Sequence, residues 1–271
     1  MHKESQENLE KFKLYLMENE RARNTIDAYT TSIKEFFKEY DTLCKENMLA
    51  FKAKQLEKWK PGTVSLRIVA LNCFCDFLGH PEWRVKKVRI HKAVCVENVI
   101  TAEEYHKLLD GLKEDGKEKQ YWMLKYLAKT GARVSEFIRL DKSGLSKGYC
   151  EMQTKGKIRR IYIPKSLIEE SKGYFDSQEG DLLFQSRYGE RYTPEGIRQW
   201  LRTIGKRYGV RKEVMHPHSF RHLYATEFLK KNGNVTLLAD LMGHSSVSTT
   251  AIYLKLSQEE QMKQFNAASD W

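Results

Sequence analysis

Two histidines, an arginine and a tyrosine near the C-terminal end of the chain have the types and spacing of a site that handles phosphate. His218 and Arg221 stand three residues apart, so they share one face if this segment is helical. Pro217 precedes them and suits the first turn of a helix, because its fixed φ and missing N–H cost nothing there. His244 and Tyr253 follow, nine residues apart. A tyrosine beside histidines and an arginine indicates a hydroxyl aimed at a phosphate group.

A second short helix and a turn must position the last two of these side chains. Apolar residues at Leu237, Leu238 and Leu241 recur with helical spacing. Gly243 follows them and is expected to end this helix as a left-handed cap. The stretch 245–250, SSVSTT, can supply the N-cap of a further helix. The sequence therefore predicts helix, glycine turn and helix ahead of the tyrosine.

Two plainer interpretations also fit these residues. A single His or Tyr on a half-apolar helix is commonly a core residue whose polar tip has one hydrogen-bond partner. Helix, glycine turn and helix from Val235 to Leu256 is also the pattern of a helix-turn-helix regulator, which binds DNA without catalysis.

The order and spacing of these motifs resemble the C-terminal signature of the tyrosine recombinases, the phage integrase family. The chain has His218-x-x-Arg221, then Gly243-His244, then Tyr253, within the stretches SFRHLYAT and LADLMGHSSVSTTAIY. The resemblance implies that Tyr253 is a nucleophile that attacks DNA and forms a covalent 3′-phosphotyrosyl intermediate. Phenol must lose its proton in this attack, and either His218 or His244 could accept that proton.

Two earlier motifs extend the resemblance. In TGARVSEFIRL, Arg133 matches the first catalytic arginine of the family and Glu136 matches an acid that supports the site, although a buried Arg–Glu pair that merely holds a helix is the plainer interpretation. The segment YCEMQT-KGK-IRRIYIP predicts a β-hairpin. The family places a catalytic lysine in this turn, which Lys155 matches, with Lys157 as the alternative.

The implied roles follow from charge and geometry. Arg133 and Arg221 suit the pentavalent phosphorus, because a guanidinium stays charged and binds oxygens bidentately. Lys155 suits protonation of the departing 5′ oxygen. This chemistry uses side chains alone, so no metal and no cofactor are expected.

The composition favours a polyanionic partner. The chain has 271 residues, and 47 Lys and Arg against 36 Asp and Glu give a net charge of +11. The five cysteines are scattered without zinc-site spacing, which indicates reduced structural thiols. The N-terminus lacks the apolar segment of a signal peptide and no stretch resembles a membrane span, so we expect a cytoplasmic protein without membrane contact.

We predict a mainly α (α+β) protein with two domains. Residues 1–92 read as a SAM-like helical bundle that resembles the family's core-binding DNA clamp, residues 93–99 as a linker, and residues 100–271 as the catalytic domain, mostly helical, with a small β-hairpin and a C-terminal tail. Thr101 and Glu104 form a capping box at its first helix. In the bundle, the candidate DNA contacts, which could equally belong to a solvated face, are Arg23, Thr25, Lys60, Thr63 and Arg67.

The resemblance implies a site-specific recombinase that integrates, excises or inverts DNA through a Holliday junction. Its expected partners are double-stranded DNA recombination sites, three further copies of the chain in a homotetramer, and accessory DNA-bending proteins. In the family the C-terminal segment packs on the next protomer. The alternatives are type IB topoisomerase-like strand relaxation and the helix-turn-helix regulator.

Overall fold

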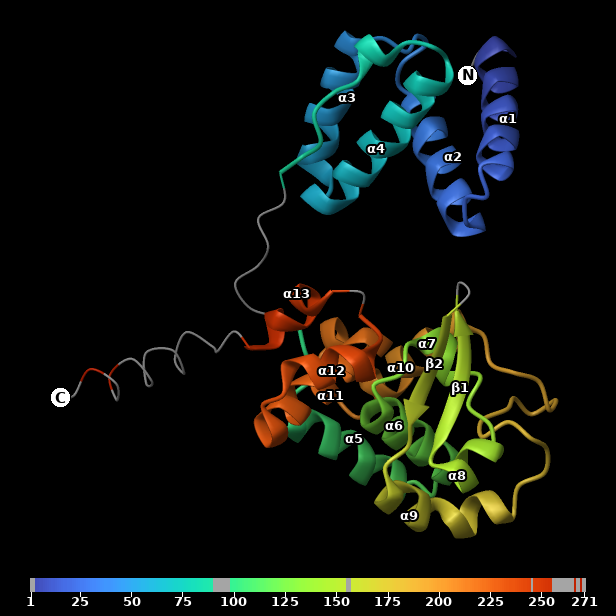
Figure 1. Ribbon diagram of the computed structural model, residues 1–271, viewed down its shortest axis with the longest axis vertical. Coiled ribbons are helices and arrows are strands. Elements are labelled where there is room, and N and C mark those ends of the chain that lie inside the picture. The colour runs from blue at the N-terminus through green and yellow to red at the C-terminus, as the bar shows by residue number, and fades with distance from the viewer. Residues whose placement is uncertain are drawn as a thin grey trace. The chain divides into compact units, whose positions relative to one another are not determined.

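The structure, a computed structural model, describes residues 3–89, 98–154, 157–244 and 246–254, together with Asn266 and Ser269. The chain divides into two compact units, Met1–Lys92 and Ala93–Trp271 (Figure 1). Most of the expected linker and nearly all of the C-terminal tail lie outside the described residues. Each unit is described by itself below.

The N-terminal unit is a small helical bundle with an aromatic core. Its fully buried side chains include Phe12, Phe36, Phe51 and Phe74, one from each helix. Rings of this size bury large apolar areas and pack edge-to-face, as Phe12 and Phe74 do with their centroids 5.0 Å apart. The elements are α1 (Lys3–Glu18), α2 (Arg23–Phe37), α3 (Lys45–Lys58), α4 (Pro61–Phe77) and the 3₁₀-helix η1 (Pro81–Trp83).

In its described residues the C-terminal unit is mainly helical, with one two-stranded sheet, so the predicted fold class is confirmed (Figure 1). Its helices are α5 (Ala102–Glu114), α6 (Glu118–Thr130), α7 (Val134–Phe137), α8 (Ser143–Lys147), α9 (Lys165–Asp176), α10 (Pro194–Arg207), α11 (Pro217–Asn232), α12 (Val235–Met242) and α13 (Val247–Thr250), with 3₁₀-helices η2 (Lys212–Val214) and η3 (Ala251–Leu254). Helices α6 and α11 pack against each other at the centre of this unit.

Local sequence signals determine several helix ends. The predicted capping box forms at α5, where the Thr101 hydroxyl accepts from the Glu104 backbone and the Glu104 carboxylate accepts from the Thr101 backbone. Gly243 ends α12 with a φ of 60°, which confirms the predicted left-handed cap. Ser246 caps α13, so the Ser/Thr-rich stretch acts as predicted. None of the described helices is both long enough and apolar enough to span a bilayer.

The predicted hairpin consists of β1 (Tyr149–Thr154) and β2 (Lys157–Tyr162), paired antiparallel. Side chains alternate between the two faces of such a pair. Cys150 pairs with Ile161 and Met152 with Arg159, so a charged residue shares the inward face with buried apolar ones. A charge on a buried face needs partners, and the partners of Arg159 lie in the candidate site.

Candidate active site

Arg221 joins three segments of the C-terminal unit. It lies on α11 and is only 4% exposed. Its Nη1 donates to the carbonyl of Gly131, which ends α6, at 2.6 Å. Its Nη2 donates to the carbonyl of Met242 at the end of α12 and lies 3.1 Å from Nε2 of His244. Five N–H donors in a rigid fork allow one side chain to hold two helix ends and a histidine together.

Arg133 stands directly before α7 as its N-cap residue. Its backbone N–H donates to Glu136 Oε2 at 2.7 Å, and its Nη1 lies 3.1 Å from Glu136 Oε1. Its Nη2 donates to the carbonyl of Gly243 at 2.9 Å. The side chain is 37% exposed, so part of the guanidinium faces solvent and can meet a ligand.

Arg159 is a site residue that the sequence reasoning missed. Its Nη1 donates to both oxygens of Glu136, at 2.5 and 2.6 Å, and its Nη2 donates to the Leu241 carbonyl at 2.7 Å. Burial would raise the pKa of Glu136, but the Arg133 backbone N–H and the charge of Arg159 outweigh it, so that pKa is lowered. Glu136 is therefore an ionised carboxylate shared by two arginines. The sequence signal that could have identified Arg159 is a charged residue at an inward-facing position of the predicted hairpin.

Position 243 requires a glycine, because the side chain of Arg159 approaches its backbone closely. A Cβ at this position would lie 2.6 Å from Cδ and Nε of Arg159, and the backbone already has a positive φ of 60°. Both conditions favour glycine alone. The Gly-His pair of the motif thus places His244 directly after a turn that no larger residue fits.

His244 is held by two hydrogen bonds. Arginine can only donate, so Nε2 of His244 accepts from Arg221 and the proton of the ring lies on Nδ1. Nδ1 then donates to the Thr250 hydroxyl at 2.7 Å. Burial, followed by the charges of Arg221 and Arg133, lowers the pKa of His244 to about 4, so the ring is neutral near pH 7.

Tyr253 lies on η3, which packs against α11. The hydrogen-bond partner of its hydroxyl among the described residues is His222, whose Nδ1 lies 2.5 Å away. The two histidines that the sequence suggested as partners, His218 and His244, do not hydrogen-bond to this hydroxyl in the part of the chain that the structure describes. Burial raises the pKa of Tyr253, and the nearby charge of Arg221 opposes that shift. His218 is exposed on the first turn of α11, with its ring 6.4 Å from that of His222.

The candidate residues in the described part of the C-terminal unit thus form one cluster, although they are spread over 121 positions from Arg133 to Tyr253. A groove of about 1380 Å³ borders it, and its lining includes Arg133, Glu136, Arg159, Gly243 and His244. Lys155, the candidate acid, lies outside the described residues, between the ends of β1 and β2. The candidate DNA contacts of the N-terminal bundle belong to the other unit.

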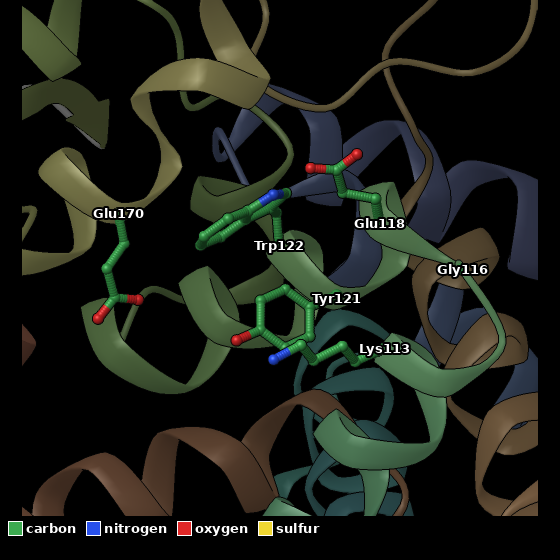
Figure 2. A pocket seen from close by; sticks show the side chains of 6 residues that line it. All are labelled: Lys113, Gly116, Glu118, Tyr121, Trp122 and Glu170. Carbon is green, nitrogen blue, oxygen red and sulfur yellow. The ribbon is translucent and has the colours of Figure 1, made fainter.

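A separate pocket of about 440 Å³ lies among α5, α6 and α9 (Figure 2). Its lining residues are Lys113, Gly116, Glu118, Tyr121, Trp122 and Glu170. It lacks the arginines and histidines that phosphate chemistry needs, so we place the candidate site at the groove. In the described ranges, no group of three or more His, Cys, Asp or Glu side chains is arranged to hold a metal ion.

The buried ion pair at the groove gives a prediction about stability. Glu136→Ala leaves Arg159 without its carboxylate, and the Arg159 side chain is only 12% exposed. We expect a loss of about 3–5 kcal/mol in the free energy of unfolding, because an unpaired charge stays buried. Urea denaturation of the full chain measures it.

Glu151→Ala is the matched control. It removes the carboxylate of an ion pair with Arg160 on the outward face of the same hairpin, where both side chains are about half exposed. Such a pair contributes about 0–1 kcal/mol. Equal losses for the two variants would contradict the buried role of Glu136.

Comparison with known proteins identifies the family of this chain. A model of the phage integrase family matches residues 98–260. The tyrosine recombinase XerA of Pyrococcus furiosus is 30% identical over 261 residues, which cover 92% of this chain and 89% of that protein. A tyrosine recombinase of Thermosipho africanus is 28% identical, covering 93% of this chain and 96% of that one. A solved structure of a lambda integrase dimer bound to a core site has a similar fold, with a TM-score of 0.74 at 17% identity, over 92% of this chain and 76% of that one.

The chain therefore belongs to the phage integrase family. It is a tyrosine recombinase, an enzyme of site-specific DNA recombination. The family resemblance drawn from the motifs is confirmed.

Proposed function

We propose that this recombinase cleaves DNA by attack of Tyr253 on a phosphodiester, holds the strand as a 3′-phosphotyrosyl ester, and rejoins it to a new 5′ end. The observation that carries the proposal is a chain of contacts that begins at the groove: Arg133 and His244 line the groove, Arg221 hydrogen-bonds to His244, and the residue after Arg221 on α11, His222, hydrogen-bonds to the Tyr253 hydroxyl. The covalent ester conserves the energy of the broken bond, so rejoining needs no external energy source.

The arginines supply charge where the reaction develops it. Arg221 is buried and held by backbone carbonyls, and Arg133 is held by Glu136 and the Gly243 carbonyl. Both guanidiniums are therefore oriented before DNA binds, so they stabilise the extra negative charge on phosphorus without rearranging. Glu136 and Arg159 support this arrangement by joining β2 to the end of α12.

The remaining roles are assigned to His218, His244 and Lys155. The exposed ring of His218 is accessible to a non-bridging oxygen of the phosphate. His244 holds Arg221 from the side of α13. Lys155 donates the proton to the 5′ oxygen, as the motif resemblance implies.

The N-terminal bundle is proposed to clamp the DNA. The five candidate contacts gather at the start of two helices: Arg23 and Thr25 in the first turn of α2, Lys60 and Thr63 at the start of α4, and Arg67 one turn later. Backbone N–H groups and the helix dipole favour phosphate at such ends. Arg67 lies over the ring of Trp59, which is 49% exposed.

The partners follow from the reaction. Solved structures of similar fold include XerH bound to its difH substrate and lambda integrase bound to a core site. For this chain we propose double-stranded recombination sites, a homotetramer on paired sites, accessory DNA-bending proteins, and a cytoplasmic location. The domain limits 1–92, 93–99 and 100–271 are proposed as the clamp, the linker and the catalytic domain.

The geometry of α12 and α13 argues against the helix-turn-helix alternative. Its second helix, α13, has four residues and continues as a 3₁₀-helix, which is short for a helix that reads a groove. The turn between the helices is occupied by Gly243 and His244, which contact Arg133 and Arg221.

A covalent trap tests the proposal. A nicked duplex carrying the native site loses the cut fragment after cleavage, so the protein–DNA ester accumulates. We expect a band shifted to the mass of protein plus DNA on a denaturing gel, in buffer containing EDTA. DNA binding without such a band would instead favour the regulator, and strand exchange between two marked duplexes separates recombination from relaxation.

A further inference from the structure

The hydrogen bond between His222 and Tyr253 involves a histidine to which no catalytic role was assigned from the sequence. His222 follows Arg221 on α11, so its side chain is turned about 100° around the helix axis from the buried arginine. That direction faces η3, which packs against α11 and carries the tyrosine. Nδ1 of His222 lies 2.5 Å from the Tyr253 hydroxyl, and the two ring centroids are 5.4 Å apart.

Both partners in this hydrogen bond are uncharged near neutral pH. Burial, together with His218, His216, Arg221 and His244, lowers the pKa of His222 to about 4. Burial raises the pKa of Tyr253 above its ordinary value. Near pH 7 the imidazole is therefore neutral and the phenol keeps its proton. In the tautomer that carries the imidazole proton on Nε2, the tyrosine O–H donates and Nδ1 of His222 accepts.

We propose that His222 is a catalytic residue: it orients the Tyr253 hydroxyl and takes its proton as the oxygen attacks phosphorus. The inference rests on the proposed function, which supplies the phosphate and the leaving group. It differs from the sequence expectation, which gave this role to His218 or His244. His244 is unsuited because both of its ring nitrogens are already engaged, by Arg221 and by Thr250.

The proposed step balances in atoms and charge. A bond forms between the Tyr253 oxygen and phosphorus, and the bond from phosphorus to the 5′ oxygen breaks. The phenolic proton moves to Nδ1 of His222, and the 5′ oxygen receives a proton from Lys155. In rejoining, the 5′ hydroxyl attacks phosphorus and gives its proton back to Lys155, while His222 returns its proton to the departing tyrosine oxygen.

The low basicity of His222 in the free protein is compatible with this step. The phenol becomes far more acidic as its oxygen bonds to phosphorus, so proton transfer accompanies bond formation. A bound phosphodiester also brings negative charge next to an imidazole surrounded by positive groups, which stabilises the protonated ring. The imidazole is thus neutral before DNA binds and able to accept a proton when the phosphate is present.

Two variants separate orientation from proton uptake. His222→Ala removes both, and we expect covalent adduct formation on the nicked duplex to slow by roughly 10²–10³-fold. His222→Asn can place an amide oxygen near the position of Nδ1, where it accepts a hydrogen bond but takes no proton. We expect it to recover only part of the lost rate. Gel-shift affinity for the same duplex should remain within about twofold for both variants, since His222 contacts the nucleophile.

A DNA substrate with sulfur in place of the bridging 5′ oxygen tests whether His222 takes part in proton transfer or has a purely structural role. A thiolate leaves without needing a proton, so this substrate should rescue Lys155→Ala. It should not rescue His222→Ala, because the proton on the nucleophile still has to be removed.

The outcomes are distinct. His106→Ala, an exposed histidine on α5, serves as the control and should react as the wild type does. A normal rate for His222→Ala, full recovery in His222→Asn, or rescue of His222→Ala by the sulfur substrate would each overturn the assignment. If circular dichroism shows that His222→Ala is unfolded, His222→Asn carries the test. Absence of adduct with the wild type would overturn the proposed function and this inference with it.

Discussion

Tyr253→Phe is expected to bind the recombination site normally and to form no covalent adduct. The substitution removes only the hydroxyl oxygen that attacks phosphorus, and the ring still packs beside the small apolar cluster of Ala225, Leu238 and Met242. The rate of adduct formation should fall by on the order of 10⁴-fold or more, since no other group replaces the nucleophile. The nicked-duplex trap and a gel shift on the same DNA measure cleavage and binding separately.

Tyr188→Phe is the matched control, because Tyr188 is 72% exposed and is not among the residues that line the groove. It should cleave as the wild type does. Residual cleavage by Tyr253→Phe at a near-normal rate would disprove the assignment of the nucleophile.

Arg221→Lys is expected to slow adduct formation by roughly 10²–10³-fold while the positive charge is retained. The arginine donates to the carbonyls of Gly131 and Met242 and to His244, and its rigid fork makes these contacts together. An ammonium on a flexible stem cannot reproduce that geometry and also meet a phosphate. Burial and the charges of Arg133 and Arg159 already lower the pKa of Arg221 to about 10, so a lysine at this position would also hold its proton less firmly.

Single-turnover cleavage rates on the nicked duplex measure this effect. Arg202→Lys provides the control, because that arginine is about half exposed and pairs only loosely with Glu195, at 3.6 Å. Because both variants keep the net charge, a difference between them reports geometry. An unchanged rate in Arg221→Lys would show that charge alone suffices at this position.

Secondary structure and helix ends could largely be predicted from the sequence. Pro217 does stand in the first turn of α11, Thr101 and Glu104 do form a capping box, and Gly243 does adopt the left-handed conformation. Each of these features depends on residues within a few positions of one another, so a local pattern contains the information. The family motifs added residue identities, and the comparisons confirm the family that they indicated.

The partners of the site residues could not be predicted in the same way. Arg133 contacts Gly243, 110 positions away, and His222 contacts Tyr253, 31 positions away. Whether the phenol meets His218, His222 or His244 depends on the rotation of α11 and on where η3 packs against it. A difference of one residue rotates a side chain by about 100° on a helix, and spacing alone does not choose among the three.

The partners of Arg159 could not be predicted from the sequence either. The hairpin was predicted, but Arg159 on its inward face forms its ion pair and its hydrogen bond only because Glu136 and the end of α12 lie opposite that face. The sequence by itself determined the helices, the caps, the hairpin and the residue types that phosphoryl transfer needs, because these follow from short-range preferences. Only the tertiary structure decided which carboxylate Arg159 neutralises and which imidazole holds the nucleophile, because those contacts join segments that packing alone brings together.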